Sequence, residues 1–444
     1  MSELAIPAAE PEWAAFAAID WADQKNFWRM VPADSKRHEA GELNNTPEAV
    51  EVWAASLEQR FGGRPIAVCL EQSRGPLVYM LAKYPHLVMY PVHPTTAALY
   101  RKTFCTSGAS DDPSDTASLL DLLLRHREEL RPRQPDTVET RLLQFLVEAR
   151  RRAVDEKTRG SNRLTDCLKL YFPQILQWFD DVTSPLVGAV LERWGSLEQL
   201  QRAHPGTQRK FLHQHNCRGK EHVEGLISSM AQAMPATRDQ AVLEAGVMIA
   251  RGLAAQLAAL RSSIAVFDKR IEELVQEHPD SRLFGSLPGS GPVMTPRLMV
   301  ALGTNRDRYQ SASELQSYSG IAPVKEASGK KEWIHCRYIC PKFLRQTFHE
   351  FAGHSITKSE WAKAYYQHLR RDQKKDHHAA VRALAFKWIR IIYCCWKNGT
   401  CYDEQVYLQS LRRRGSLLGA SLAAATTVGW QPVAGFQKLS EKTA

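Results

Sequence analysis

Four carboxylates stand where a metal-dependent nucleic-acid enzyme would need them: Asp20, Glu71, Asp112 and Asp115. Asp20 and Glu71 each end a short apolar run, while Asp112 and Asp115 lie three residues apart at the start of an expected helix and so share one of its faces. Crowded carboxylates repel one another unless a cation neutralises them. Mg²⁺ prefers oxygen ligands, and two such ions can activate a nucleophile and stabilise a leaving oxygen in phosphodiester chemistry. The four residues therefore indicate either a hard-cation site or scattered surface charge.

The helical pair has a second interpretation. The segment Asp112-Pro113-Ser114-Asp115 is also a good helix start, with Asp112 as the N-cap, Pro113 in the first position and Asp115 favoured by the helix dipole. The spacing alone leaves both interpretations open.

The elements that must position these carboxylates lie within residues 10–135. Apolar runs predict strands near residues 14–19, 26–31, 66–70 and 86–92, with helical segments between the later ones. A meander followed by alternating β and α units predicts a mixed sheet with helices on its faces, which is an α/β domain.

Residues 136–280 are expected to form a helical linker and a coiled-coil region. Apolar residues recur there at alternating spacings of four and three, at Leu253, Leu257, Leu260, Ile264, Phe267, Ile271 and Leu274. This heptad stripe predicts either a coiled coil with a partner helix or a helix buried within one domain. A partner helix from another copy would make the protein a homo-oligomer, a dimer or a tetramer. An arginine-rich stretch in the same region, with Arg150, Arg151 and Arg163, is a candidate nucleic-acid contact.

Residues 281–415 are expected to form a third, mostly α-helical domain, and residues 416–444 a flexible tail. The formal net charge is +10, and residues 321–415 hold 19 Lys and Arg against 8 Asp and Glu. Aromatic residues are interleaved with these charges, which suits a polyanion because cations meet phosphates and aromatic rings stack on bases. A solvated basic face is the alternative.

Bulk properties favour a folded intracellular protein. Hydrophobic residues make up 44% of the 444 residues, and nine cysteines show no disulfide framework. We find no signal-peptide pattern and no run of about 18 apolar residues, so we expect no membrane association and a cytoplasmic location.

The arrangement of the carboxylates resembles the RuvC/RNase-H-like domain of the DEDD transposases of the insertion-sequence-110 family. That pattern is an Asp ending the first strand, a Glu on a later strand and an Asp-x-x-Asp-Ala helix start. This chain has Ile19-Asp20-Trp21, Leu70-Glu71-Gln72 and Asp112-Pro113-Ser114-Asp115-Thr116-Ala117. Thr116 departs from the family's Ala and leaves the carboxylates in place.

The second half of the chain extends the resemblance. The family's transposase domain begins with a Pro-Gly-x-Gly-Pro turn and continues with Gly-Leu-x-Pro and Ser-Gly, here Pro288–Pro292, Gly320–Pro323 and Ser328-Gly329. The first of these resembles a helix-hairpin-helix turn, in which Gly289 and Gly291 would let backbone amides approach a phosphate. A plain turn between helices would have the same sequence.

The resemblance implies a bacterial DNA transposase that acts at the nucleoid. Ser328 would attack DNA and form a phosphoserine link. The carboxylates would hold two Mg²⁺ ions, for which Mn²⁺ is the alternative. Donor and target DNA would be chosen by pairing to a structured guide RNA from the element. Nearby cations are candidates to hold the scissile phosphate: Lys330, Lys331, Arg337, Lys342 and Arg345.

Other interpretations stay open from the residues alone. Ser290 and Ser319 are alternative nucleophiles, and Ser328 could belong to a flexible loop that only contacts phosphate. A metal-dependent Holliday-junction-type endonuclease would use the four carboxylates with water as nucleophile. A non-catalytic nucleic-acid binder would need neither the carboxylates nor the serine.

Overall fold

The computed structural model describes residues 12–104, 111–329 and 331–415. The chain divides into two compact units between Pro135 and Asp136, and each unit is described by itself. Lys330 and the predicted tail at 416–444 lie outside the described residues.

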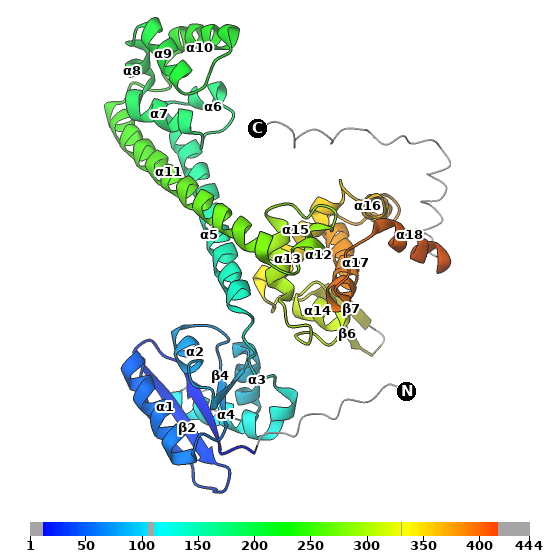
Figure 1. Ribbon diagram of the computed structural model, residues 1–444. Coiled ribbons are helices and arrows are strands. Elements are labelled where there is room, and N and C mark those ends of the chain that lie inside the picture. Colours follow the sequence, from blue (N-terminus) through cyan, green and yellow to red (C-terminus); the bar gives the residue numbers. More distant parts are fainter. Residues whose placement is uncertain (1–11, 105–110, 330, 416–444) are drawn as a thin grey trace. The chain divides into compact units, whose positions relative to one another are not determined.

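The first unit is built on a five-stranded mixed sheet in the order β3-β2-β1-β4-β5 (Figure 1). Its strands are β1 (Ala15–Asp20), β2 (Lys25–Pro32), β3 (Glu39–Asn44), β4 (Ile66–Leu70) and β5 (Leu87–Pro91). The first three form an antiparallel meander, and β4 and β5 then join in parallel beside β1. The prediction of a mixed sheet from a meander followed by β and α units is confirmed.

Helices cover both faces of this sheet. Helices α1 (Pro47–Phe61) and α2 (Pro76–Leu81) pack on one face, against Ile66, Val68 and Leu70 of β4. Helices α3 (Pro94–Phe104) and α4 (Asp112–His126) pack on the other, against Ala67 and Cys69. Because β4 is buried on both sides, its sequence is a continuous apolar run that ends where Glu71 reaches the sheet edge. A short 3₁₀ turn, Arg127–Glu129, follows α4.

The second unit contains a long antiparallel pair of helices, α5 (Val138–Tyr171) and α11 (Gln240–Glu277) (Figure 1). The antiparallel alignment is shown by side-chain contacts along the pair, which join Tyr171 to Gly246, Gly160 to Leu257, Arg150 to Asp268 and Thr140 to His278. The heptad stripe of α11 therefore has a partner helix within the same chain. Leu253 and Leu257 are buried in one core, and Ile271 and Leu274 in another. The stripe residues between them are half-buried: Leu260, Ile264 and Phe267.

By length and composition alone, α11 is also the one helix among the described residues that could cross a membrane. From the sequence we expect no such segment. Because its apolar stripe packs along α5, the hydrophobicity of α11 has an explanation within the fold.

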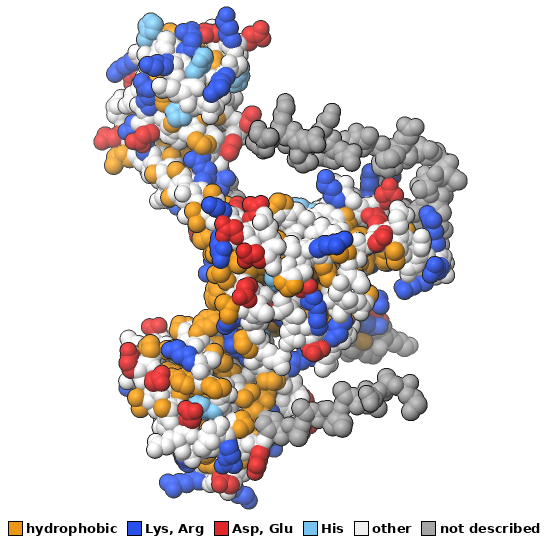
Figure 2. Space-filling model, in the orientation of Figure 1, with side chains coloured by type: hydrophobic (Ala, Val, Ile, Leu, Met, Phe, Trp, Pro, Cys, Tyr) orange, Lys and Arg blue, Asp and Glu red, His pale blue; other side chains and the backbone are white. Residues whose placement is uncertain are grey.

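Small helices complete the two ends of this pair. At one end, the shared core includes α6 (Ile175–Trp178), α7 (Pro185–Trp194), α8 (Leu197–Gln201), α9 (Pro205–Gln214) and α10 (Lys220–Gln232). At the other, a core rich in Trp and Phe is formed by α12 (Ser281–Gly285), α13 (Met294–Leu302), α14 (Ala312–Tyr318), α15 (Lys342–Ser355), α16 (Glu360–Arg371), α17 (His377–Asn398) and α18 (Glu404–Arg413). Lys and Arg side chains are prominent over α18 in Figure 2.

One element of the second unit differs from the mostly helical domain expected there. Strands β6 (Pro323–Ser328) and β7 (Lys331–Cys336) pair as an antiparallel hairpin between α14 and α15. The segment containing Ser328 is thus a paired strand end and not an irregular loop.

Candidate active site

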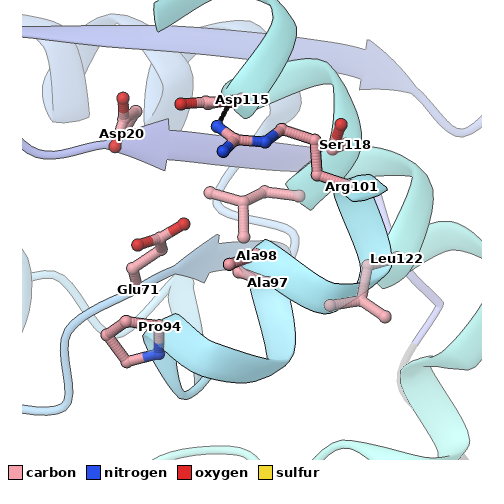
Figure 3. Close-up of a pocket in the computed structure, with 10 residues that line it drawn as sticks. Asp20, Glu71, Pro94, Ala97, Ala98, Arg101, Asp115, Ser118 and Leu122 are labelled. Carbon is pink, nitrogen blue, oxygen red and sulfur yellow. Dashed lines mark hydrogen bonds and ion pairs between the residues drawn. The ribbon is translucent and has the colours of Figure 1, made fainter. Parts of the chain in front are cut away.

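Three of the four predicted carboxylates line one cleft of the first unit. Asp20 ends β1, Glu71 follows the neighbouring parallel strand β4, and Asp115 lies in the first turn of α4. Figure 3 shows their carboxylates directed toward a common space. The cleft measures about 270 Å³ and is lined by Asp20, Glu71, Pro94, Ala97, Ala98, Arg101, Asp115, Ser118, Leu119 and Leu122.

The local chemistry of the cleft disfavours ionisation. Burial, and after it the charges of Glu71, Asp112 and Asp115, raises the pKa of Asp20 to about 6. Burial likewise raises the pKa of Glu71, and the charge of Asp115 adds to this while Arg101 opposes it. Asp112 does not line the cleft but is near enough to raise the pKa of Asp20. The four carboxylates therefore form one electrostatic group.

Arg101 of α3 was not anticipated from the sequence. Its guanidinium forms an ion pair with Asp115 inside the cleft, and both side chains are mostly buried (Figure 3). The sequence does hold one clue, because Pro94, Ala97, Ala98 and Arg101 share one face of α3 by helical spacing. Small residues on that face open the cleft and leave Arg101 to supply its positive charge.

The alternative interpretation, in which Asp112 is the N-cap of α4, is wrong, because the cap is the preceding residue. Asp111 is the N-cap of α4, since its Oδ1 accepts the amide N–H of Ser114 at 2.8 Å. Asp112 is the first residue of the helix. Asp112 is therefore not needed for capping, and its carboxylate can serve the acidic group.

The oxygen ligands of the cleft fit a hard divalent cation by their chemistry, but their present positions are too far apart to hold one. Oxygen ligands gathered in a cleft that raises their pKa gain from a cation's charge. Within the described ranges, however, no three acidic, His or Cys side chains are already close enough together to hold an ion. Arg101 occupies the position of a counter-ion to Asp115, so a metal would bind as this ion pair opens.

Ser328 lies in the second unit, at the exposed end of the β6–β7 hairpin. It pairs across the hairpin with Lys331, and Gly329 beside it has a φ of +59°, as tight hairpin turns require. A hydroxyl at a strand end next to a lysine is accessible to a large substrate and has a cation beside it.

The base of this hairpin is fixed to the helical core. The carbonyl of Gln316 accepts the amides of Ile321 and Ala322 at 3.1 and 2.9 Å, and Arg382 of α17 donates to the carbonyl of Gly320 at 2.5 Å. Gly320 has a φ of +72°, and a Cβ there would lie 2.3 Å from the sulfur of Cys340. The Gly-Ile-Ala-Pro motif thus anchors the strand that carries Ser328, and the sequence did not reveal Gln316 or Arg382 as its partners.

The two alternative serines are engaged elsewhere. Ser319 is fully buried and donates to the carbonyl of Gln316 at 3.2 Å. Ser290 is half-buried, and its hydroxyl is 2.7 Å from that of Thr295. Ser328 is the most exposed of the three.

The predicted phosphate-binding turn lies between α12 and α13, as expected. Gly289 has a φ of +86°, and a Cβ there would meet the backbone of His354 at 3.0 Å. Glycine is therefore required at position 289 by packing against α15, whereas a side chain at Gly291 would meet open space. A phosphate contact at this turn stays a prediction.

The predicted basic contacts fall into two groups. Around the hairpin, Lys331 and Lys342 are exposed, and Arg337 and Arg345 are half-buried. On α5, Arg163 is exposed.

The remaining two arginines of α5 form ion pairs within the chain. Arg150 pairs with Asp268 of α11, and Arg151 pairs with Asp155 and Glu350. These acids reduce the charge that Arg150 and Arg151 can offer to a phosphate.

Comparison with known proteins gives a consistent result for both halves of the chain. A family model described as a transposase, of the DEDD type and the IS110 group, matches residues 17–173, which include all four carboxylates. A second, described as the transposase IS116/IS110/IS902 family, matches residues 281–367, which include Ser328. Together the two matches span more than half of the chain.

Similar whole proteins also come from insertion elements. The chain is 25% identical to the mini-circle putative transposase for IS117 of Streptomyces coelicolor, over 89% of this chain and 97% of that protein. It is 24% identical to an uncharacterized 42 kDa protein of IS900 from Mycobacterium paratuberculosis, over 89% and 98% of the two chains. It is 26% identical to an uncharacterized 44.8 kDa protein of IS116 from Streptomyces clavuligerus, over 62% and 68%.

Proposed function

The chain belongs to the IS110 family of transposases, and from this premise we propose that it exchanges DNA strands through a covalent link between DNA and Ser328. The observation that carries the proposal is the exposed Ser328 at the end of an anchored hairpin, opposite Lys331. The chain is a DNA transposase that acts on DNA, and its DEDD-type domain indicates a divalent metal cofactor.

In the proposed reaction, the Oγ of Ser328 attacks a DNA phosphorus and its proton is released. An Oγ–P bond forms, one P–O bond of the strand breaks, and the leaving oxygen takes up a proton. A hydroxyl of another strand then attacks the same phosphorus, restores a phosphodiester and returns the serine. The phosphorus keeps two ester bonds before, during and after the exchange, so strands can be rejoined without ATP.

Residues of the hairpin would bind and orient the scissile phosphate. Lys331 lies directly across from Ser328, and Lys342 and Arg345 begin the helix that follows. Their positive charges favour the negative charge that develops on the phosphoryl oxygens during attack. Fixing the hairpin through Gln316 and Arg382 keeps the nucleophile in place while it stays exposed.

The carboxylate cleft would hold the cation. We assign Asp20, Glu71, Asp112 and Asp115 as its ligands, with two Mg²⁺ ions as the natural occupants and Mn²⁺ as a substitute. A bound divalent cation supplies charge stabilisation at a phosphoryl centre and lowers the pKa of a coordinated hydroxyl.

Partners and location follow from the same premise. Sequence choice by a structured RNA of the element would suit a protein that offers basic, aromatic surfaces and reads nucleic acid by shape. Self-association through α11 would use the apolar side chains that α5 leaves exposed, among them Val266. We place the protein in the bacterial cytoplasm, at the nucleoid when it acts.

Trapping the intermediate tests the proposal. Full-length protein incubated with Mg²⁺ and DNA carrying the element's ends, with the element's RNA present, should yield a protein–DNA adduct that survives denaturation and maps to Ser328. The adduct should be lost in Ser328→Ala and kept in Ser290→Ala, the matched control in a neighbouring motif. Strand cutting without any adduct would support a nuclease that uses water as its nucleophile.

A further inference from the structure

Strand β7 and the segment that follows it expose four large apolar side chains. Trp333 is 50% exposed, Ile334 69%, Tyr338 79% and Ile339 58%. An exposed indole costs free energy in water, and a two-stranded hairpin has little core of its own in which to bury it. These side chains are therefore placed to contact something outside the chain.

The pairing register puts one of them beside the serine. Residues directly opposite in an antiparallel pair point to the same face, and so do residues two apart along a strand. Ser328 is opposite Lys331, and Trp333 is opposite Glu326, so Ser328, Lys331 and Trp333 share one face. Ile334, opposite Lys325, points to the other face.

The spacing on this face matches one nucleotide. Trp333 is the diagonal neighbour of Ser328, and such neighbours are about 7–8 Å apart in antiparallel pairs. That separation is comparable with the span from a phosphate to the base of the same nucleotide. A phosphate placed at Ser328 and Lys331 would thus bring a base over the indole.

The face that carries Trp333 offers one lysine to a nucleic-acid partner, because Lys331 beside Ser328 is exposed. Glu332 forms an ion pair with Lys325 at 2.9 Å on the opposite face. Glu326, opposite Trp333, lies 3.5 Å from His335 and is neutralised there when His335 is protonated. Among the described residues, Trp333 has no aromatic ring in contact with its own and no hydrogen-bond partner for its indole N–H.

We propose that Trp333 stacks on an unpaired DNA base next to the phosphate that Ser328 attacks, and so holds the strand open at the exchange point. The inference rests on the proposed function, because it takes the strand at Ser328 to be DNA. Stacking on an aromatic ring tolerates every base, which suits a protein whose sequence choice would lie elsewhere.

The test uses the full-length chain carrying Ser328→Ala, so that no chemistry occurs, and a DNA duplex with a short central mismatch that contains 5-iodouracil. Light couples iodouracil to an aromatic ring stacked on it, and mass spectrometry then identifies the residue. We expect the cross-link on Trp333. We also expect Trp333→Ala to weaken binding of this DNA about tenfold, whereas Trp333→Phe should lose about threefold at most.

Ile334→Ala is the matched control, since it removes an exposed apolar side chain from the opposite face of the same hairpin. It should bind the mismatched DNA as the parent does, and so should all variants with a fully paired duplex. Cross-links elsewhere, equal losses in Ile334→Ala, or a cross-link formed only with iodouracil-labelled RNA would overturn the inference.

The two proposals fail separately. If wild-type protein forms no serine–DNA adduct but Trp333 still cross-links to DNA, then the serine chemistry is wrong and the stacking stands. If the adduct forms at Ser328 and Trp333→Ala changes neither cross-linking nor affinity, then the stacking is wrong and the chemistry stands.

Discussion

Replacing Asp20 by Asn should stabilise the metal-free protein and remove its response to Mg²⁺. The carboxyl of Asp20 has a pKa raised from 3.8 to about 6, chiefly by burial and then by the charges of Glu71, Asp112 and Asp115. Asn has nearly the same shape but does not ionise, so it keeps the packing at the end of β1 and removes the repulsion.

The size and the pH range of the effect follow from this shift. Well below pH 3.8, Asp20 is protonated in both states and contributes little. Between about pH 4 and 6 the folded state keeps a proton that the unfolded state has released, so the free energy of unfolding falls as pH rises. The full shift corresponds to about 3 kcal/mol. Since Asp20 is only half-buried, we halve this for solvent screening to about 1.5 kcal/mol.

Hydrogen exchange in the full-length chain measures this, because amides of β4 report the opening of the sheet beside Asp20. Without metal and above pH 6, the free energy of opening at the β4 amides should be about 1–2 kcal/mol higher in Asp20→Asn than in wild type. Near pH 4 the two proteins should show the same free energy of opening. Saturating Mg²⁺ should reverse the order, since a ligand at a hundred times its Kd stabilises by about 2.7 kcal/mol only the protein that binds it. A variant less stable than wild type at pH 7 without metal, or equally stabilised by Mg²⁺, would refute the reasoning.

Three further perturbations probe other contacts. Arg101→Met removes the cation paired with Asp115 and keeps much of the side chain, so calorimetry should show Mn²⁺ binding about fivefold tighter, a gain of about 1 kcal/mol; weaker binding would instead mean that Arg101 supports the metal site. Gly246→Ala should destabilise the second unit by about 1–3 kcal/mol in urea unfolding, because the new Cβ would lie 2.5 Å from the ring of Tyr171. Gly252→Ala, at an open position of the same helix, should gain up to about 1 kcal/mol, and equal effects at the two glycines would contradict this. Arg382→Ala loosens the base of the hairpin, so formation of the serine–DNA adduct should fall about tenfold with circular dichroism unchanged, whereas an unchanged rate would show that the hairpin needs no such anchor.

Local patterns were sufficient for the first unit. The apolar runs that end at Asp20 and before Glu71 are strands because they are short, continuous and buried, and parallel neighbours end at the same edge of a sheet. Cap position was less secure, because Asp111 and Asp112 are equally good caps by type and only the amide of Ser114 distinguishes them. Arg101 was missed for a related reason: helical spacing places it on the small-residue face of α3, but its contact with Asp115 joins two helices and cannot be read from the sequence.

The second unit shows where periodicity is insufficient. The heptad stripe of α11 reveals an apolar face but does not say which helix covers it, and α5 offers a face that is interrupted by Arg150, Arg151 and Gly160. The β6–β7 hairpin left no alternating apolar pattern, because both of its faces are largely exposed. Its base is held by the carbonyl of Gln316 and the side chain of Arg382, which bind backbone groups of residues 320–322 just before β6.

Counting charges along the sequence does not show which of them are already paired in the fold, and this changes where nucleic acid should bind. Arg150 and Arg151 stand in a basic run, yet they pair with Asp268 and Glu350, which are far away in sequence. Glu350 also holds the buried Arg297, so removing either partner would leave a charge uncompensated in the core. A run whose charges are already committed to packing contributes little to counterion release. The exposed Lys331 and Lys342 have no comparable role in the described core, so the salt dependence of DNA binding should fall more on losing these two lysines than on losing Arg150 and Arg151.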